Sequence, residues 1–372
     1  MHLIRLTPDR RGARAERGFT LIELMISVGL SLMILAGLVT VFVNNSNTRK
    51  EIERTTRQIE NGRYGMELLS SNLTHAGFFA EFDPTTVPSP VALPEACSTA
   101  IDDIKAGLAL PIQGYRDATT GTAGLGCLTD LKDGTDVVVV RRASTCVAGS
   151  TGCDLLTSGA FYYFQASLCN PTTGNAELAS TDITNFYKLD SVTANLDRHK
   201  RTCLTSNCVC VTSGSVPLAD IRRFHVHIYF VANNSVGTDG VPTLKRAELA
   251  GGGFAIASLV EGIEDLKLEY GIDTTQPLGD GLPDAYTPTP DTYACAGPPV
   301  CTAISNWRNV TAARMFLLAR STEASPGYIA SSKTYTLSTD GATTFTPASG
   351  DRFRRHVFNT TVKLANIAGR RG

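Results

Sequence analysis

One segment near the N-terminus limits the fold and the location of this chain more than any other feature. From Leu24 to Val43 the sequence holds twenty consecutive residues without a charged side chain. As an α-helix they would span ~30 Å, the thickness of the hydrocarbon core of a bilayer. Arginines precede the segment and most of the chain follows it, which predicts a cytoplasmic N-terminus and an exported body.

Two ordinary explanations of such a segment fit it incompletely. The apolar part of a cleaved secretory signal runs ~7–15 residues and ends in a small-x-small cleavage site. Here the polar residues 44–47 follow the apolar run, and they contain no such site. An uncleaved signal anchor explains the hydrophobicity but not the order of the residues at its start.

The start of the segment carries a specific motif. Residues 18–25 read GFTLIELM after a short basic leader, residues 1–18. This pattern resembles the cleavage and methylation motif of type IV prepilins and type II secretion pseudopilins. The resemblance implies that a prepilin peptidase in the inner membrane cuts between Gly18 and Phe19 and methylates Phe19. Glu23 would then be the fifth residue of the mature chain, the position that the family reserves for glutamate.

The position of Glu23 also has a physical argument of its own. A carboxylate at the middle of a bilayer costs roughly 2.5–3.5 kcal/mol and is retained only with a partner. After cleavage the amine of Phe19 is a cation. In a staggered array of helices, Glu23 of one subunit and Phe19 of a neighbour would neutralise each other. The alternative is that Glu23 lies among the lipid headgroups.

The helix is predicted to continue beyond the membrane half, residues 19–43. No proline occurs between residue 19 and Pro84. Two rows of apolar or small residues recur every seven positions on one side: Ile52, Ile59, Met66 and Leu73, and Gly62, Leu69 and Ala76. We therefore expect residues 44–80 to be an amphipathic half that lies against a globular head.

Residues 81–372 are predicted to form a β-rich head. Six β-type runs occur there, separated by stretches rich in Gly, Ser, Thr and Asn: Asp136–Val140, Phe161–Phe164, Phe224–Phe230, Leu266–Ile272, Arg314–Arg320 and Val357–Leu364. The third and fourth runs alternate apolar and polar residues, which predicts half-buried strands. Strands grouped after one long helix indicate an α+β fold with an antiparallel sheet packed on the helix.

The head is larger than that of a major pilin. Three of its segments, residues 260–273, 306–321 and 354–364, resemble the PilW group of minor pilins, which is related to the J-type minor pseudopilin of type II secretion. The resemblance implies a subunit that helps initiate pilus assembly at or near the filament tip. The implied partners are other minor and major pilins and the pilus assembly platform. The implied location is the inner membrane and then the filament, with the head periplasmic or extracellular.

All ten cysteines lie in the head, and none precedes Cys97. In an exported protein they are most simply disulfides, at most five. Two predicted pairs close short loops, and a third is a longer-range candidate: Cys146–Cys153, Cys295–Cys301 and Cys97–Cys127. The remaining pairings stay open, with disulfide-stapled loop insertions expected around residues 97–210.

Two groups of residues suggest a transition-metal site. The first consists of three cysteines and a nearby histidine, Cys203, Cys208, Cys210 and His199. Its spacing is not the CxxC type of zinc ribbons and knuckles, so disulfides are favoured. In the second group, His225 and His227 project to one face of a predicted strand. No third ligand is evident nearby, so we expect both histidines on the solvent side.

Asp273, Asp280 and Asp284 surround a glycine-containing turn and are candidate calcium ligands. Carboxylates around such a turn suit Ca²⁺, and the GDGxxD fragment resembles calcium loops of other extracellular proteins. The spacing departs from the EF-hand pattern, because Pro277 and Leu278 stand where further ligands would be. A polar turn after a strand is the alternative. The sequence indicates no other cofactor.

Enzyme motifs are absent from the sequence. GxSxG, HExxH and P-loop patterns do not occur, and Gly251–Gly253 lacks a phosphate-loop context. The formal net charge of −1 gives no electrostatic reason to expect nucleic-acid binding as the main task. Two alternatives to a minor pilin stay open. One is a type II secretion minor pseudopilin, and the other is a tip adhesin or DNA-binding head, whose clustered basic residues are Arg352, Arg354, Arg355, Arg370 and Arg371.

Intact mass spectrometry of the protein from membranes tests the processing site and the compartment together. We expect a mature chain that begins with N-methyl-Phe19 and gains two hydrogens for each disulfide on reduction. A chain that keeps Met1, or one cut beyond Val43, would indicate a signal anchor or a secreted protein and would contradict the filament interpretation.

Overall fold

The computed structural model describes residues 18–167, 177, 182–200, 218–275, 279–295, 301–330 and 333–371. The chain divides into two units, Met1–Glu53 and Arg54–Gly372. Helix α1 (Leu21–Thr74) begins in the first unit and ends in the second. The described part of the first unit consists of three residues without secondary structure and the N-terminal part of α1.

The larger of the two main sheets in the second unit is antiparallel and has seven strands. In chain order these are β1 (Ile112–Ala118), β2 (Thr135–Ala143), β3 (Tyr163–Ala166), β4 (Tyr187–Asp190), β5 (Ile221–Ala232), β6 (Thr243–Ala250) and β7 (Gly253–Glu261). Strand β5 is central. One edge of β5 pairs with β2, while the other pairs first with β3 and then with β6. Strands β1, β4 and β7 pair with β2, β3 and β6.

The second main sheet has the strand order β13-β10-β8-β9. Its strands are β8 (Ile263–Ile272), β9 (Ala285–Thr287), β10 (Val310–Arg320) and β13 (Arg355–Lys363), and a small hairpin joins β11 (Tyr335–Thr336) to β12 (Thr344–Phe345). The short helices are α2 (Ile101–Ala106), α3 (Ala303–Arg308) and α4 (Ala365–Ala368), with 3₁₀ turns η1 (Pro84–Thr86), η2 (Gly107–Ala109), η3 (Ile183–Asn185), η4 (Thr193–Asn195) and η5 (Pro290–Thr292). The α+β class and all six predicted strands are confirmed.

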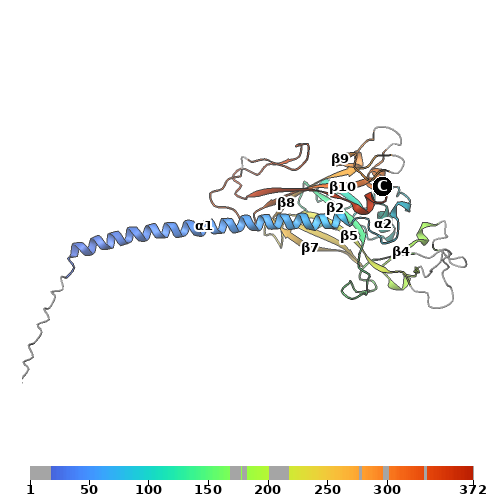
Figure 1. The fold of residues 1–372 in the computed structure, drawn as a ribbon, viewed down its shortest axis with the longest axis horizontal. Coiled ribbons are helices and arrows are strands. Elements are labelled where there is room, and N and C mark those ends of the chain that lie inside the picture. Colours follow the sequence, from blue (N-terminus) through green and yellow to red (C-terminus); the bar gives the residue numbers. More distant parts are fainter. Residues whose placement is uncertain are drawn as a thin grey trace, which may run out of the picture. The chain divides into compact units, whose positions relative to one another are not determined.

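The C-terminal turns of α1 contact both main sheets (Figure 1). Their buried residues are Gln58, Gly62, Gly65, Met66, Leu69 and Leu73. A Cβ atom built on Gly65 would lie 3.1 Å from Leu317 of β10 and 3.9 Å from Leu244 of β6. Glycine therefore lets the helix backbone approach both sheets closely, and one hydrophobic cluster joins the helix to residues of both.

The buried face of α1 agrees with the predicted one except at two positions. Met66 and Leu73 of the first predicted row and the whole second row, Gly62, Leu69 and Ala76, are buried as expected, but Ile52 and Ile59 are 61% and 41% exposed. A row of residues seven apart rotates by about 20° per heptad around a straight α-helix. Because the buried residues 58, 62, 65 and 69 lie on the other side of the Met66–Leu73 row, this rotation carries Ile59 and Ile52 away from the core.

Strand β5 is buried on both faces, so the predicted half-buried strand is wrong here. Phe224 and Phe230 belong to a second hydrophobic cluster with Phe79, whereas Tyr229 and Val231 belong to the cluster around α1. All ten residues of β8 are buried as well. Alternation left one face of each strand for solvent. In the structure α1 covers that face of β5, whereas the segments around Asp117 and Thr339 cover that face of β8.

The end of the chain closes the end of α1. The helix ends at Thr74, and Gly77 after it has a φ of +73°, which glycine adopts without strain. Asn366 of α4 donates through Nδ2 to the carbonyls of Thr74 and Ala76, at 3.4 and 3.2 Å. The terminal carbonyls of a helix have no hydrogen-bond partner within the helix. Here the side chain of Asn366 supplies a donor.

Truncation of Leu73, which is 1% exposed, should destabilise the head. Leu73→Ala removes a side chain from the cluster between α1 and the sheets, so we expect a loss of about 2–5 kcal/mol in the free energy of unfolding. Urea unfolding followed by the fluorescence of the single tryptophan, Trp307 in the same cluster, measures this loss. Leu155→Ala at a 77% exposed leucine is the matched control and should change stability by less than about 0.5 kcal/mol.

Candidate functional site

The predicted processing and assembly residues lie at the start of α1. Gly18 and Phe19 precede the helix and are exposed, Phe19 at 88%. Thr20 and Glu23 form a reciprocal pair: Glu23 N–H donates to Thr20 Oγ1 at 3.3 Å, and Thr20 N–H donates to Glu23 Oε2 at 3.0 Å. This is a capping box, which satisfies two N–H groups that have no partner inside the helix.

The capping box holds the Glu23 carboxylate at the helix N-terminus of the same chain. The Thr20 hydroxyl donates a further hydrogen bond to Glu23 Oε2 at 2.8 Å, and a negative charge near a helix N-terminus is favourable. Sequence reasoning missed Thr20, although the Thr-x-x-Glu spacing is a known signal. The pairing of Glu23 with Phe19 of a neighbouring subunit, and cleavage after Gly18, stay predictions.

The apolar segment of α1 is uncovered within the described chain. Its large hydrophobic side chains from Leu24 to Val43 are 48% to 76% exposed, and the helix is long and apolar enough to cross a membrane. An apolar surface of this extent is not left to water in a soluble protein. A lipid bilayer or the apolar helices of other subunits must therefore cover it.

The structure joins the three cysteine pairs that the sequence singled out. The pairs Cys97–Cys127, Cys146–Cys153 and Cys295–Cys301 have Cα–Cα distances of 5.5, 5.7 and 5.5 Å, within the usual disulfide range. Cys97–Cys127 links the segment after α1 to the β1–β2 connection, and the other two pairs close short loops. The zinc candidates Cys203, Cys208 and Cys210 lie outside the described residues, while His199 contacts Glu177 Oε1 at 2.6 Å through Nδ1.

The aspartates of the predicted calcium turn accept hydrogen bonds from their own turn. Asp273 is fully buried, and its Oδ2 accepts the N–H of Gly281 at 2.9 Å. Asp284 Oδ2 accepts the N–H and the hydroxyl of Thr274. Asp280 Oδ1 accepts the N–H two positions on. These bonds are typical of a polar turn, the alternative that the sequence offered, and the calcium site stays a prediction.

His225 and His227 are buried, so their predicted solvent-side position is wrong. They are 8% and 2% exposed, because α1 covers this face of β5, where His227 Nδ1 lies 3.2 Å from Asn72 Oδ1. Glu248 of β6 stands beside both histidines, with Oε1 3.1 Å from His225 Nδ1 and 3.6 Å from His227 Nε2. The β5–β6 register, which pairs His227 with Glu248, supplies the third group that sequence reasoning missed.

Among the residues that the structure describes, these three form the one group whose ligand atoms lie close enough for a metal ion. Arginines already neutralise the carboxylate: Arg223 donates to Glu248 Oε1 and Arg246 to Oε2. Burial lowers the pKa of His227 to about 3, with the charge of Arg246 acting in the same direction. The same burial and the same arginines oppose a divalent cation, so the arrangement works chemically as a buried polar network.

The basic residues near residue 354 do not form a surface patch. The side chain of Arg355 is 1% exposed and donates to Glu264 and Asp351. The guanidinium of Arg354 lies over the ring of Tyr328, 4.4 Å from its centroid. The other predicted basic pair, at the end of the chain, lies in a different part of the head.

Comparison with known proteins places these features in a family. Residues 13–39 match the prokaryotic N-terminal methylation motif, and residues 228–366 match the type IV pilus-assembly protein W family. No curated protein and no solved structure matches the chain. The methylation motif and the exposed apolar helix define a membrane-anchored type IV pilin-like protein, a structural class.

The second match defines the class more closely. The two matches together support a PilW-type minor pilin of a type IV pilus, involved in pilus assembly. It therefore interacts with other pilins and with the pilus machinery. The match begins in β5 and ends in α4, so it covers β6, β7 and the whole second sheet. Of the two systems that the sequence left open, this family model supports the pilus.

Removing the disulfides should destabilise the head in the order of their loop lengths. Cys97–Cys127 and Cys295–Cys301 close loops with sequence separations of 30 and 6. By loop-closure entropy, replacing both cysteines by serine should cost about 3.7 kcal/mol for the first pair and about 2.2 kcal/mol for the second. Urea unfolding of the two double variants measures the difference, and equal losses would contradict the loop-length argument.

Proposed function

We propose that this minor pilin is incorporated at or near the filament tip and helps to initiate assembly through packing of its N-terminal helix. The observation that carries the proposal is the exposed apolar surface of α1 from Leu24 to Val43. In the membrane, lipid covers this surface. In the filament, the corresponding helices of neighbouring pilins would cover it. The helix can leave the lipid only if such a partner buries its apolar surface, because exposure of that surface to water is unfavourable.

Processing would prepare the helix for this exchange. Cleavage by the prepilin peptidase between Gly18 and Phe19 would create a cationic N-terminus on Phe19. Glu23 of a neighbouring subunit would need this positive charge as its partner. Glu23 would exchange its hydrogen bonds to Thr20 for a charge-assisted pair with Phe19 of a neighbour, which is stronger in apolar surroundings. The assembly platform in the inner membrane would then move the paired helices out together.

A part of the head that lies outside the family match supports a position at the end of the filament. Residues 81–227, which include α2 and β1–β4, lie outside the family match. Two of the three described disulfides stabilise this part, which favours a periplasmic and then extracellular head. A subunit within the shaft must fit neighbours on all sides. A subunit at the tip has one side without a neighbour, and that side can accommodate the additional residues 81–227.

A chromosomal Glu23→Ala variant tests the proposal. We expect fewer pili per cell, close to the number in a gene deletion, because the variant lacks the carboxylate that pairs with Phe19. Glu60→Ala is the matched control: Glu60 is an exposed glutamate of the same helix, outside the apolar segment, and its loss should leave the pilus number unchanged. Electron microscopy gives the count, and immunogold labelling of the head gives the position.

The proposal fails on either of two results. The first is a deletion strain whose pilus number and length equal those of the wild type. The second is gold label spread evenly along the shaft, which would keep the protein as a pilus subunit but remove its place at the tip.

A further inference from the structure

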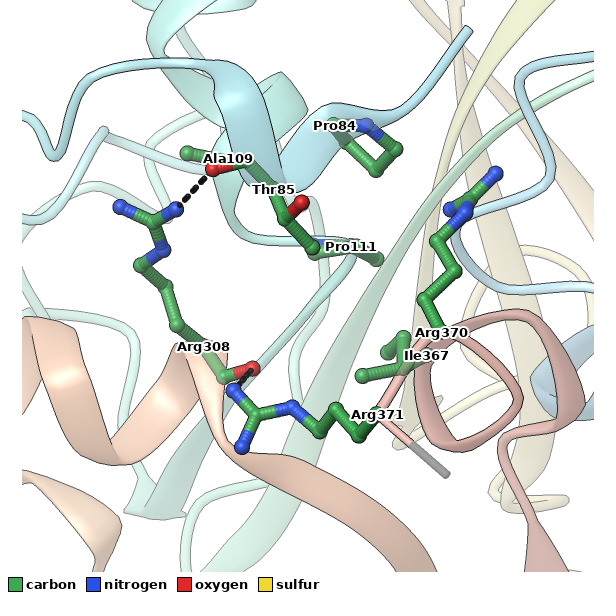
Figure 2. A pocket seen from close by; sticks show the side chains of 8 residues that line it. All are labelled: Pro84, Thr85, Ala109, Pro111, Arg308, Ile367, Arg370 and Arg371. Carbon is green, nitrogen blue, oxygen red and sulfur yellow. Dashed lines mark hydrogen bonds between the residues drawn. The ribbon is translucent and has the colours of Figure 1, made fainter. Parts of the chain in front are cut away.

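Three arginines from distant parts of the sequence surround a pocket in the head. Figure 2 shows Arg308, Arg370 and Arg371 on different sides of the hollow, with Thr85 and Pro111 opposite Arg371. Arg308 is the last residue of α3, while the other two follow α4. The pocket has a volume of about 70 Å³.

The size of the pocket limits what it can hold. A cavity needs roughly 10–15 Å³ to accommodate one water molecule, so 70 Å³ is enough for about five non-hydrogen atoms. A carboxylate or a phosphate group has this size, whereas a whole nucleotide does not. Pro111 and the buried Ile367 give the pocket apolar walls between the guanidinium groups.

The hydrogen bonds of the three guanidinium groups all go to uncharged acceptors. Each group makes two such bonds in the structure, whereas a guanidinium has five N–H donors. The six acceptors are Ser89 Oγ and Thr85 O for Arg308, Gly77 O and Phe82 O for Arg370, and Arg308 O and Asn309 Oδ1 for Arg371. Donors therefore remain for a ligand, and none of these bonds cancels a positive charge.

Nearby carboxylates compensate the three charges only in part. Asp83 Oδ1 lies 3.7 Å from Arg370 Nε, and Asp273 Oδ2 lies 3.8 Å from Arg371 Nη1. Both distances exceed that of a hydrogen bond, and Asp273 also accepts N–H bonds from its own turn. In the described part of the chain, Arg308 forms no ion pair with a carboxylate.

Partial burial makes this positive charge costly. Burial lowers the pKa of all three arginines, and the charge of Arg308 adds to the effect at Arg371. Buried charges require a partner of opposite sign, and two carboxylates beyond hydrogen-bond distance face three cations. An anion in the pocket would supply the missing charge and accept the unused N–H donors.

We infer that the pocket binds a single oxyanion group, a carboxylate or a phosphate, held by Arg308, Arg370 and Arg371. Guanidinium groups bind both kinds of oxyanion through paired N–H bonds. The Thr85 side chain, which also lines the pocket, supplies a hydroxyl. This inference is independent of the place of the protein in the filament, because it concerns only contacts within the head.

Binding of small anions to the full chain in detergent tests the inference. The probes are inorganic phosphate and acetate, each titrated by calorimetry at constant ionic strength with chloride as the balancing ion. We expect one saturable site per chain for at least one probe, with a Kd on the order of 1 mM. Tighter binding of phosphate would assign the site to phosphate groups, and tighter binding of acetate would assign it to carboxylates.

Two variants separate this pocket from general anion effects. Arg308→Gln should raise the Kd at least tenfold, because it removes the guanidinium that has no carboxylate partner. Arg352→Gln, at an exposed arginine outside the pocket, should leave the Kd within twofold. If Arg308→Gln does not fold, Arg308→Lys keeps the charge but loses the paired N–H geometry, and it should still weaken binding several-fold. Absence of saturable binding by both probes, or equal Kd values in wild type and the folded Arg308 variant, would overturn the inference.

Discussion

The head depends on the burial of one face of α1 against both main sheets. Gly65 allows the helix backbone to approach β6 and β10, and Leu69 and Leu73, each 1% exposed, complete the shared hydrophobic cluster. The first sheet also buries its opposite face, in the cluster around Phe79. The helix thus covers one face of each main sheet. The helix is at once an anchor and the centre of the fold.

The same helix has opposite environments along its length. From Gln58 to Leu73 a narrow face is buried by the chain itself, whereas from Leu24 to Val43 no described residue covers the apolar side chains. In the first stretch the chain itself buries the helix side chains. In the second stretch lipid or other subunits must cover them. The head therefore buries its own core, whereas the N-terminal segment requires partners to cover its apolar side chains.

The contacts of several charged and polar residues depend on which distant segments pack together. Arg308 lies far from Arg370 and Arg371 in sequence, yet the placement of α3 and α4 makes them walls of one pocket. His225 and His227, which lie on a face that alternation assigned to solvent, face α1 and Glu248 instead. In both cases the local sequence does not reveal which distant residues become neighbours of the side chain. Those neighbours determine whether the side chain is buried and which groups it contacts.

The sequence by itself determined the features that depend on residues close along the chain. These are the uncharged run after Glu23, the motif around Gly18, the strands and the short cysteine loops, because length, order and periodicity act locally. Only the tertiary structure decided how far the buried face of α1 extends, that β5 is covered on both sides, and which arginines share a pocket. These outcomes follow from contacts between segments far apart in the sequence, such as that of Asn72 in α1 with His227 in β5, and residue spacing carries no information about such contacts.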